Sequence, residues 1–164
     1  MTRTQLIEDL KVFIEDTVKD FILPTKLKKG DAEQALRSPV VFKQRVPDSR
    51  SATDKAPCIL LQLTNATDSQ AEGNKAESSA IVRIVFMIYC NDEQEGGMAL
   101  LEVMERVRIA LLKIIYLNNQ YMLDLSNGME TNVYNDDTAP FYIGEMITTW
   151  HMPPVKREVN FNGY

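Results

Sequence analysis

The sequence predicts an α+β fold, in which a mainly antiparallel sheet of about four to six strands carries two main helices packed on one face. Two segments repeat apolar residues every three or four positions, which is typical of amphipathic helices. Apolar or alternating runs of strand length lie between and after them. We find no internal repeat and no clear boundary, so we expect a single α+β domain over residues 1–152 and a C-terminal extension over 153–164 that is a candidate for contacts with other chains.

The first predicted element is an amphipathic helix over residues 4–23. Its apolar side is formed by Leu6, Leu10, Phe13, Ile14, Val18 and Phe21, with acidic and basic residues on the other side. Thr2 or Thr4 can cap its start, and Pro24 blocks its continuation.

Three strands are expected next, at residues 39–45, 57–66 and 78–90. The polar stretch before them allows one short helical turn at "DAEQAL", and residues 47–56 read as a loop. Between the second and third strands, "TDSQAEGNKAES" has no large apolar side chain. It predicts a long hairpin loop at 65–77.

The strand at 78–90 is apolar on both faces. Alternate residues from Ala80 to Cys90 face one side, which we assign to the core. The other side carries Ile81, Val85, Met87 and Tyr89 together with Arg83. Such a strand is covered on both sides within its own fold, or on one side by a partner.

The acidic turn "NDEQEGG" precedes a second helix, expected at 97–116, where carboxylates complement the helix dipole. One side of this helix carries an apolar stripe. Ile109, however, falls inside the opposite, charged stripe, and Leu112 lies at its edge. These two residues add to the expectation of a partner surface.

Period-two patterns return after the second helix. "YMLDLS" and "METNVYN" flank Asn127-Gly128, which predicts a β-hairpin. "FYIGEMITTWHM" at 141–152 is the last expected strand, and Pro153-Pro154 ends it.

Composition and the first residues indicate a soluble protein that is intracellular when made. The 164-residue chain has a net charge of −5, which argues against general binding to nucleic acid or anionic membranes. Its start lacks the uninterrupted apolar core of a signal peptide. Cys58 and Cys90 lie in apolar runs without a C-x-x-C spacing, so free thiols are favoured over a disulfide.

No catalytic, cofactor or metal site is predicted, and we expect a protein that is not an enzyme. His151 is the only histidine and has no serine or cysteine motif beside it, so a surface or interfacial role is favoured. The carboxylates at 91–95 and 135–137 lack the spacing of a calcium loop. Gly96-Gly97 has no accompanying phosphate-binding lysine.

Several segments carry a resemblance to a known family: the N-terminal amphipathic helix, "PCILLQL", the long polar hairpin, "AIVRIVFMIYCNDEQEGGMALLEVMERVRIALL" and "PFYIGEMITTWHMP". Over residues 4–152 the chain resembles phage tail-terminator or tail-completion (head–tail joining) proteins, a family that includes collar proteins of contractile phage-like particles. The resemblance lies in the order of elements, and the family has no catalytic residues to carry over.

The resemblance implies a structural protein that forms a hexameric ring on the last ring of tail-tube protein. Such a ring stops tube or sheath polymerisation and provides the surface for joining the head. Its implied partners are copies of itself, the tail-tube protein, and sheath and head-joining proteins; DNA passes through the lumen without specific binding, and no membrane is involved. The implied location is the host bacterial cytoplasm during assembly, then the tail of the virion or phage-like particle.

The sequence patterns and the resemblance together indicate two groups of candidate residues. Candidate subunit or tube contacts are Ile81, Val85, Met87, Tyr89, Ile109, Leu112, Trp150, Phe161 and Tyr164. Candidate loop residues facing the lumen or the tube are Asp68, Glu72, Lys75 and Glu77. Trp150 fits the core equally well. Three alternatives stay open: a neck or head-completion protein of the same particle, a small-molecule-binding or enzymatic α+β domain with a pocket on the second face of its sheet, and a bacterial adaptor acting as a dimer.

Overall fold

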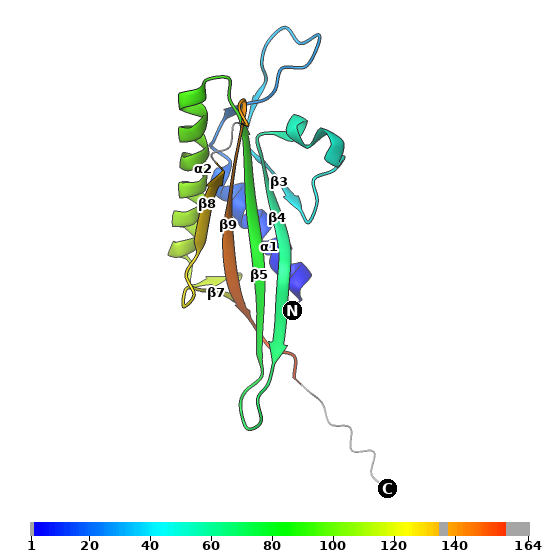
Figure 1. Cartoon of the computed structure of the whole chain (residues 1–164). Helices are drawn as coiled ribbons and strands as arrows, with labels where there is room; N and C mark the ends of the chain where they lie inside the picture. The colour runs from blue at the N-terminus through cyan, green and yellow to red at the C-terminus, as the bar shows by residue number, and fades with distance from the viewer. Residues whose placement is uncertain (1, 135–137, 157–164) are drawn as a thin grey trace.

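The computed structural model describes residues 2–134 and 138–156, with the backbone alone for residues 49–51. In these residues the chain forms α1 (Arg3–Val18), β1 (Leu23–Pro24), β2 (Leu36–Arg37), β3 (Val40–Lys43), the 3-10 helix η1 (Ser49–Lys55), β4 (Cys58–Ser69), β5 (Glu77–Tyr89), α2 (Glu93–Lys113), β6 (Tyr116–Leu117), β7 (Tyr121–Asp124), β8 (Glu130–Tyr134) and β9 (Phe141–Met152). Figure 1 shows β4, β5 and β9 as the long axis of the molecule.

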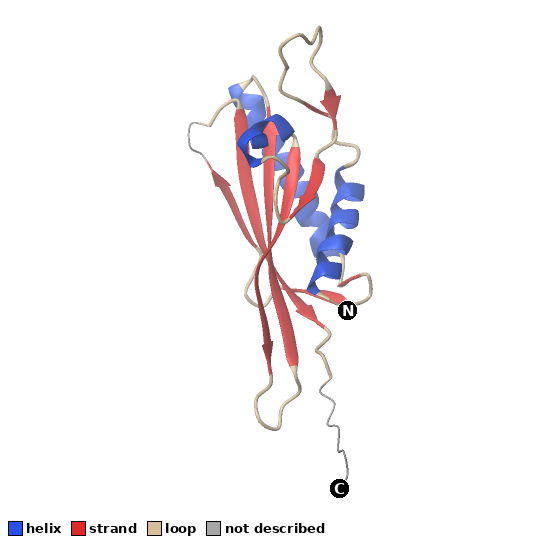
Figure 2. Ribbon diagram, turned by 90° about the vertical axis from the view of Figure 1, so that its right-hand side faces the viewer, coloured by secondary structure: helices blue, strands red, loops and turns tan. Residues whose placement is uncertain are grey.

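The predicted fold class is confirmed. Strands β3 to β9 form one mostly antiparallel sheet of seven strands, and β1 and β2 form a separate two-stranded hairpin. α1 packs against β3 and β4, α2 packs against β5 and β9, and the two helices contact each other. Both helices therefore lie on one face of the sheet, as Figure 2 shows. None of the helices in the described part of the chain is both long enough and apolar enough to cross a membrane.

The core lies between this face and the two helices. Alternate β5 residues from Ala80 to Ile88 are buried, as their period of two predicts. The buried residues of α1 are Leu6, Ile7, Leu10, Ile14 and Val18, and those of α2 are Gly96, Leu100, Val103, Met104, Val107 and Leu111. The helical spacing of these positions places them on the sheet-facing side of each helix.

Trp150 belongs to this core, so its assignment as a contact residue is wrong. Its side chain has no solvent exposure. The indole N–H donates to the Thr148 hydroxyl over 2.9 Å, and that hydroxyl donates to the Val82 carbonyl over 2.9 Å. Because both buried polar groups have partners, the large ring can be buried without an unmet hydrogen bond.

The expected hairpin at Asn127-Gly128 does not form. β7 and β8 both pair antiparallel with β9, along successive parts of its length, so they run in the same direction. Gly128 has a positive φ of 79° and donates its N–H to the Leu125 carbonyl over 3.0 Å, whereas Asn127 keeps a negative φ. A two-residue hairpin of the Asn-Gly kind needs positive φ at both residues. The turn at these residues instead separates β7 from β8 along the same side of β9.

The second helix begins four residues before the predicted start. The Asp92 carboxylate accepts hydrogen bonds from the backbone N–H groups of Gln94 and Glu95, at 2.9 and 3.0 Å. Asp92 is therefore the N-cap, and the acidic residues form the first turn rather than a preceding loop. Gly96 and Gly97, which were expected to open the helix, lie inside it. The first helix, in contrast, ends at Val18, five residues earlier than predicted.

The loop between β4 and β5 is shorter than predicted. Strand pairing continues to Ser69 and Glu77, so the connection spans residues 70–76 instead of 65–77. Beside β4, β3 pairs in parallel with Cys58–Leu61 alone, and a bulge follows between Leu63 and Asn65. The "DAEQAL" segment forms no helix, and η1 occupies part of the expected loop at 47–56.

Two adjacent glycines of α2 give a matched test of this packing. A Cβ on Gly97 would meet no atom within 4 Å, whereas a Cβ on Gly96 would lie 2.1 Å from the Tyr142 ring. We expect Gly97→Ala to raise the free energy of unfolding by about 0.5–1 kcal/mol, because alanine favours the helix. Gly96→Ala lowers it by about 1 kcal/mol or more, because the ring must move. Urea unfolding followed by circular dichroism measures both, and stabilisation by both substitutions would show that Tyr142 does not pack on the helix.

Candidate subunit interface

The face of the sheet opposite the helices is apolar and only half-buried. We call it the outer face, and its apolar residues are Phe42, Leu60, Ile81, Val85, Met87, Ile143 and Ile147. Strand register brings them together from β3, β4, β5 and β9, since directly paired residues share one face. The structure thus joins three predicted residues, Ile81, Val85 and Met87, in one patch.

One end of the outer face is covered by the chain itself. Tyr89 has an exposed fraction of only 8%, so its assignment as a contact residue is not supported. Its ring lies 5.3 Å from that of Phe141, between centroids, and the Lys26 ammonium lies 6.0 Å from the Phe141 ring centre. Lys26 in turn pairs with Asp54 of η1 over 2.9 Å. Lys26, just after β1, therefore lies against this end, and the exposed patch begins at Met87.

A charged pair lies in the middle of the outer face. The Arg83 guanidinium donates to the Glu145 carboxylate, and Gln62 accepts a further bond from Arg83 over 3.4 Å. The Glu145 side chain is 12% exposed and that of Arg83 is 37% exposed. Burial raises the pKa of Glu145, but hydrogen bonds from Tyr134 and Arg83 outweigh burial and hold it below its usual value.

A second apolar surface lies on α2. We call it the α2 stripe: Met98, Leu101, Ile109 and Leu112, with exposed fractions of 56, 43, 40 and 40%. Helical spacing places the stripe on the side of α2 opposite its buried residues. A shallow hollow adjoins it, lined by Phe21, Glu102, Glu105, Arg106 and Ile109. The predicted residues Ile109 and Leu112 therefore belong to a surface separate from the outer face.

The β4–β5 hairpin extends beyond the body of the molecule, as Figure 1 shows. Asp68 lies on its shaft, where its carboxylate accepts from the Ser78 hydroxyl over 2.6 Å and from Arg3 of α1. These bonds lower the pKa of Asp68. Glu77 also belongs to the paired strands, whereas Glu72 and Lys75 lie exposed in the connecting loop. Only two of the four predicted loop residues are thus in the loop.

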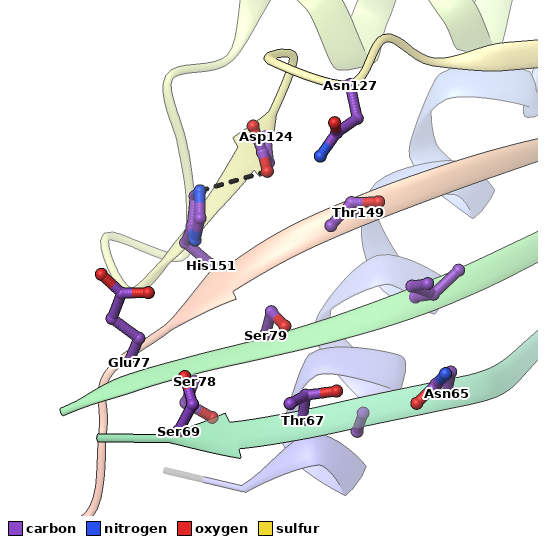
Figure 3. Close-up of a pocket in the computed structure, with 12 residues that line it drawn as sticks. Asn65, Thr67, Ser69, Glu77, Ser78, Ser79, Asp124, Asn127, Thr149 and His151 are labelled. Atoms are coloured by element: carbon purple, nitrogen blue, oxygen red, sulfur yellow. Dashed lines mark ion pairs between the residues drawn. The ribbon is translucent and has the colours of Figure 1, made fainter. Parts of the chain in front are cut away.

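A polar hollow of about 440 Å³ lies on the outer face near the hairpin, shown in Figure 3. Its lining includes Asn65, Thr67, Ser79, Thr149 and the pair formed by His151 and Asp124, whose Nε2 and Oδ2 atoms are 3.3 Å apart. Hydrogen bonds from the hydroxyl and the backbone N–H of Ser126 lower the pKa of Asp124. The sequence signal for this hollow was a set of polar residues at outer-face positions of three strands. The hollow was not predicted, because these residues lie far apart along the chain.

The hollow does not contain an assembled nucleophile. Ser79 lies opposite His151 in the β5–β9 register, but within residues 2–134 and 138–156 no hydrogen bond joins their side chains. The same residues bring no three His, Cys, Asp or Glu side chains together as metal ligands. Both cysteines are free thiols, and burial raises the pKa of Cys58 to about 11. What the hollow offers is hydrogen-bonding groups for a polar ligand.

Two predicted contact residues, Phe161 and Tyr164, lie outside the described residues. No protein-family model matches this chain, and no curated protein sequence matches it.

The charged pair of the outer face predicts a pH effect. The pKa of Glu145 is lower in the folded chain than in the unfolded chain. The charged carboxylate therefore stabilises the fold at any pH above the unfolded-state pKa, and this stabilisation is lost as the pH falls through the folded-state pKa. We expect Glu145→Gln to lower the free energy of unfolding by about 1 kcal/mol at pH 7, with a smaller difference in acid. Urea unfolding at several pH values measures this. Glu130→Gln, at an exposed residue of β8, is the control and changes little; a difference independent of pH for Glu145→Gln would contradict the assignment.

Proposed function

We propose that this protein is a structural ring protein of a phage or phage-like tail, which caps the tail tube, ends tube or sheath polymerisation and provides the surface for joining the head. The observation that carries the proposal is the outer face: both helices pack on the other side of the sheet, and the apolar residues Ile81, Val85 and Met87 stay half-exposed. Contiguous apolar surface of this kind marks a site of protein contact.

The presence of two apolar surfaces supports a ring rather than an isolated pair. A symmetric dimer made through one surface leaves the other exposed to water. Head-to-tail contacts use two different surfaces on every copy, and they close into a ring when the rotation between copies allows it. The outer face and the α2 stripe provide such a pair of surfaces.

The hairpin supports a role at the tube. Its connecting loop is polar and extends away from the body, and the chain as a whole carries a net charge of −5. DNA is held mainly by Lys and Arg contacts that release counterions. An acidic ring would let DNA pass through its lumen without holding it. The polarity and extension of the hairpin support a position at the lumen or against the tube.

The polar hollow supports a second candidate function, a small-molecule-binding domain. Its hydroxyl, amide and His151–Asp124 groups suit a small polar ligand. A neck or head-completion protein of the same particle would share the ring surfaces proposed above. Deleting the gene separates these candidates, because loss of a terminator gives overlong tails, loss of a neck protein gives tails of normal length without heads, and loss of a ligand-binding protein changes neither.

Substitution on the outer face tests the ring. Val85→Arg places a charge in the centre of the half-exposed patch, so we expect rings to be lost while the fold is kept. Size-exclusion chromatography with light scattering and negative-stain images measure assembly, with tail tubes added if wild-type protein is monomeric alone. Val12→Arg, at an exposed position of α1, is the matched control and should assemble normally. Normal assembly and normal tail length with Val85→Arg would contradict the proposal.

Shortening the hairpin tests its placement. Replacing residues 70–76 by Asn-Gly keeps the β4–β5 pairing and the Arg3–Asp68 contact, because those groups lie on the shaft. We expect rings that still form but cap tubes poorly or impair DNA ejection. Electron microscopy of tail length and an ejection assay measure these effects. Normal length together with normal ejection would remove the hairpin from the lumen and the tube surface.

A further inference from the structure

From the two unlike surfaces of this chain, we propose that the outer face of one copy binds the α2 stripe of the next copy, with Arg83 of the first copy facing Glu102 of the second. This inference rests on the ring in the proposed function, but not on its role in a tail. It commits to a second copy as the occupant of both surfaces.

The shapes of the two surfaces support this pairing. The outer face is a sheet surface with half-buried apolar residues, and the α2 stripe is a row of exposed apolar side chains along a helix. Within this same chain the other side of α2 already packs on the other side of β5 and β9. The proposed contact repeats that arrangement between copies: a helix with an apolar side lies on an apolar sheet.

The charges support the same pairing. Glu102 has no hydrogen-bond or ion-pair partner among residues 2–134 and 138–156, whereas Glu105 beside it is paired with Arg108 over 2.5 Å. Arg83 pairs with the mostly buried Glu145, yet 37% of its own side chain is exposed. The guanidinium has five N–H donors, so it can bind a second carboxylate. Glu102, which lines the hollow beside the α2 stripe, supplies that carboxylate.

The position of α2 supports a closed assembly. α2 packs against β5 and β9, and Figure 1 shows it beside β8, at one side of the sheet. Because α2 lies at that side of the sheet, its stripe is set toward the same side. Head-to-tail contacts between two surfaces at an angle rotate each copy relative to the last, and they close into a ring when that rotation allows it.

Mixing two variants tests the inference. Val85→Arg disables the outer face, and Ile109→Arg disables the α2 stripe. We expect each variant alone to be monomeric, because each has only one working surface. Mixed in equal amounts, they should form dimers and nothing larger, since one working pair of surfaces remains. Light scattering of the full-length proteins measures the mass, and circular dichroism confirms that each variant is folded.

Crosslinking identifies the contact directly. Arg83→Cys and Glu102→Cys are made in separate chains, both with Cys90→Ser, leaving Cys58 buried. A short bismaleimide should join the mixed pair and neither chain to itself. A dimer formed by Val85→Arg alone or by Ile109→Arg alone would show a symmetric contact and overturn the inference. A crosslink between two Arg83→Cys chains would do the same.

Absence of both the mixed dimer and the mixed crosslink, at high concentration and with tail tubes present, also overturns it. Failure of this kind is distinguishable from failure of the proposed function. Tail length after gene deletion reports the role in the tail, whichever surfaces the copies use. A mixed crosslink together with unchanged tail length would keep the head-to-tail contact and reject termination.

Discussion

The structure depends on one constraint: β5 is apolar on both sides, and the chain has helices for only one of them. β5 pairs along nearly its whole length with β4 and β9, so it cannot turn its second side away from water. The helices cover the side that carries Val82, Ile84 and Phe86, which are fully buried. The other side stays half-exposed, and the outer face follows from that imbalance.

Arg83 and Glu145 are charged residues within this apolar side, and their desolvation lowers the stability of the fold. Two apolar residues of similar size would pack there at no desolvation penalty, and replacement of buried ion pairs by apolar residues is often neutral or stabilising. A charged pair does, however, restrict which surfaces can lie against it, because a partner must satisfy the remaining donors of Arg83. In the assembly proposed above, the pair would favour specificity of contact over stability of the single chain.

Local patterns predicted much of this fold. The periods of two and of three to four located β5, α1 and the core side of α2, because these patterns reflect burial directly. Long-range pairing was not predictable in the same way. Asn127-Gly128 has a hairpin sequence, but β9 offered both flanking segments a longer partner, and the local preference was overridden.

Some residues of the candidate site were also predictable from the sequence, and others were not. Ile81, Val85 and Met87 were predicted because excess apolar residues on one strand are visible in the sequence. Trp150 and Tyr89 were misassigned, because an aromatic residue in a strand has the same pattern whether a core or a loop covers it. The polar hollow was missed entirely, since its residues come from separate strands and become neighbours only through the register of the sheet.

The short pairing of β3 with β4 has a consequence for the free protein. Beyond Leu61 the described chain places no further strand beside β4, so backbone donors and acceptors face solvent there. Open edges of this kind can recruit strands from other molecules and begin aggregation. The bulge after Leu63 interrupts the regular spacing of those groups, and the polar side chains of Thr64, Asn65 and Thr67 keep this stretch hydrated. These two features therefore make the uncovered part of β4 a poor template for strands of other molecules.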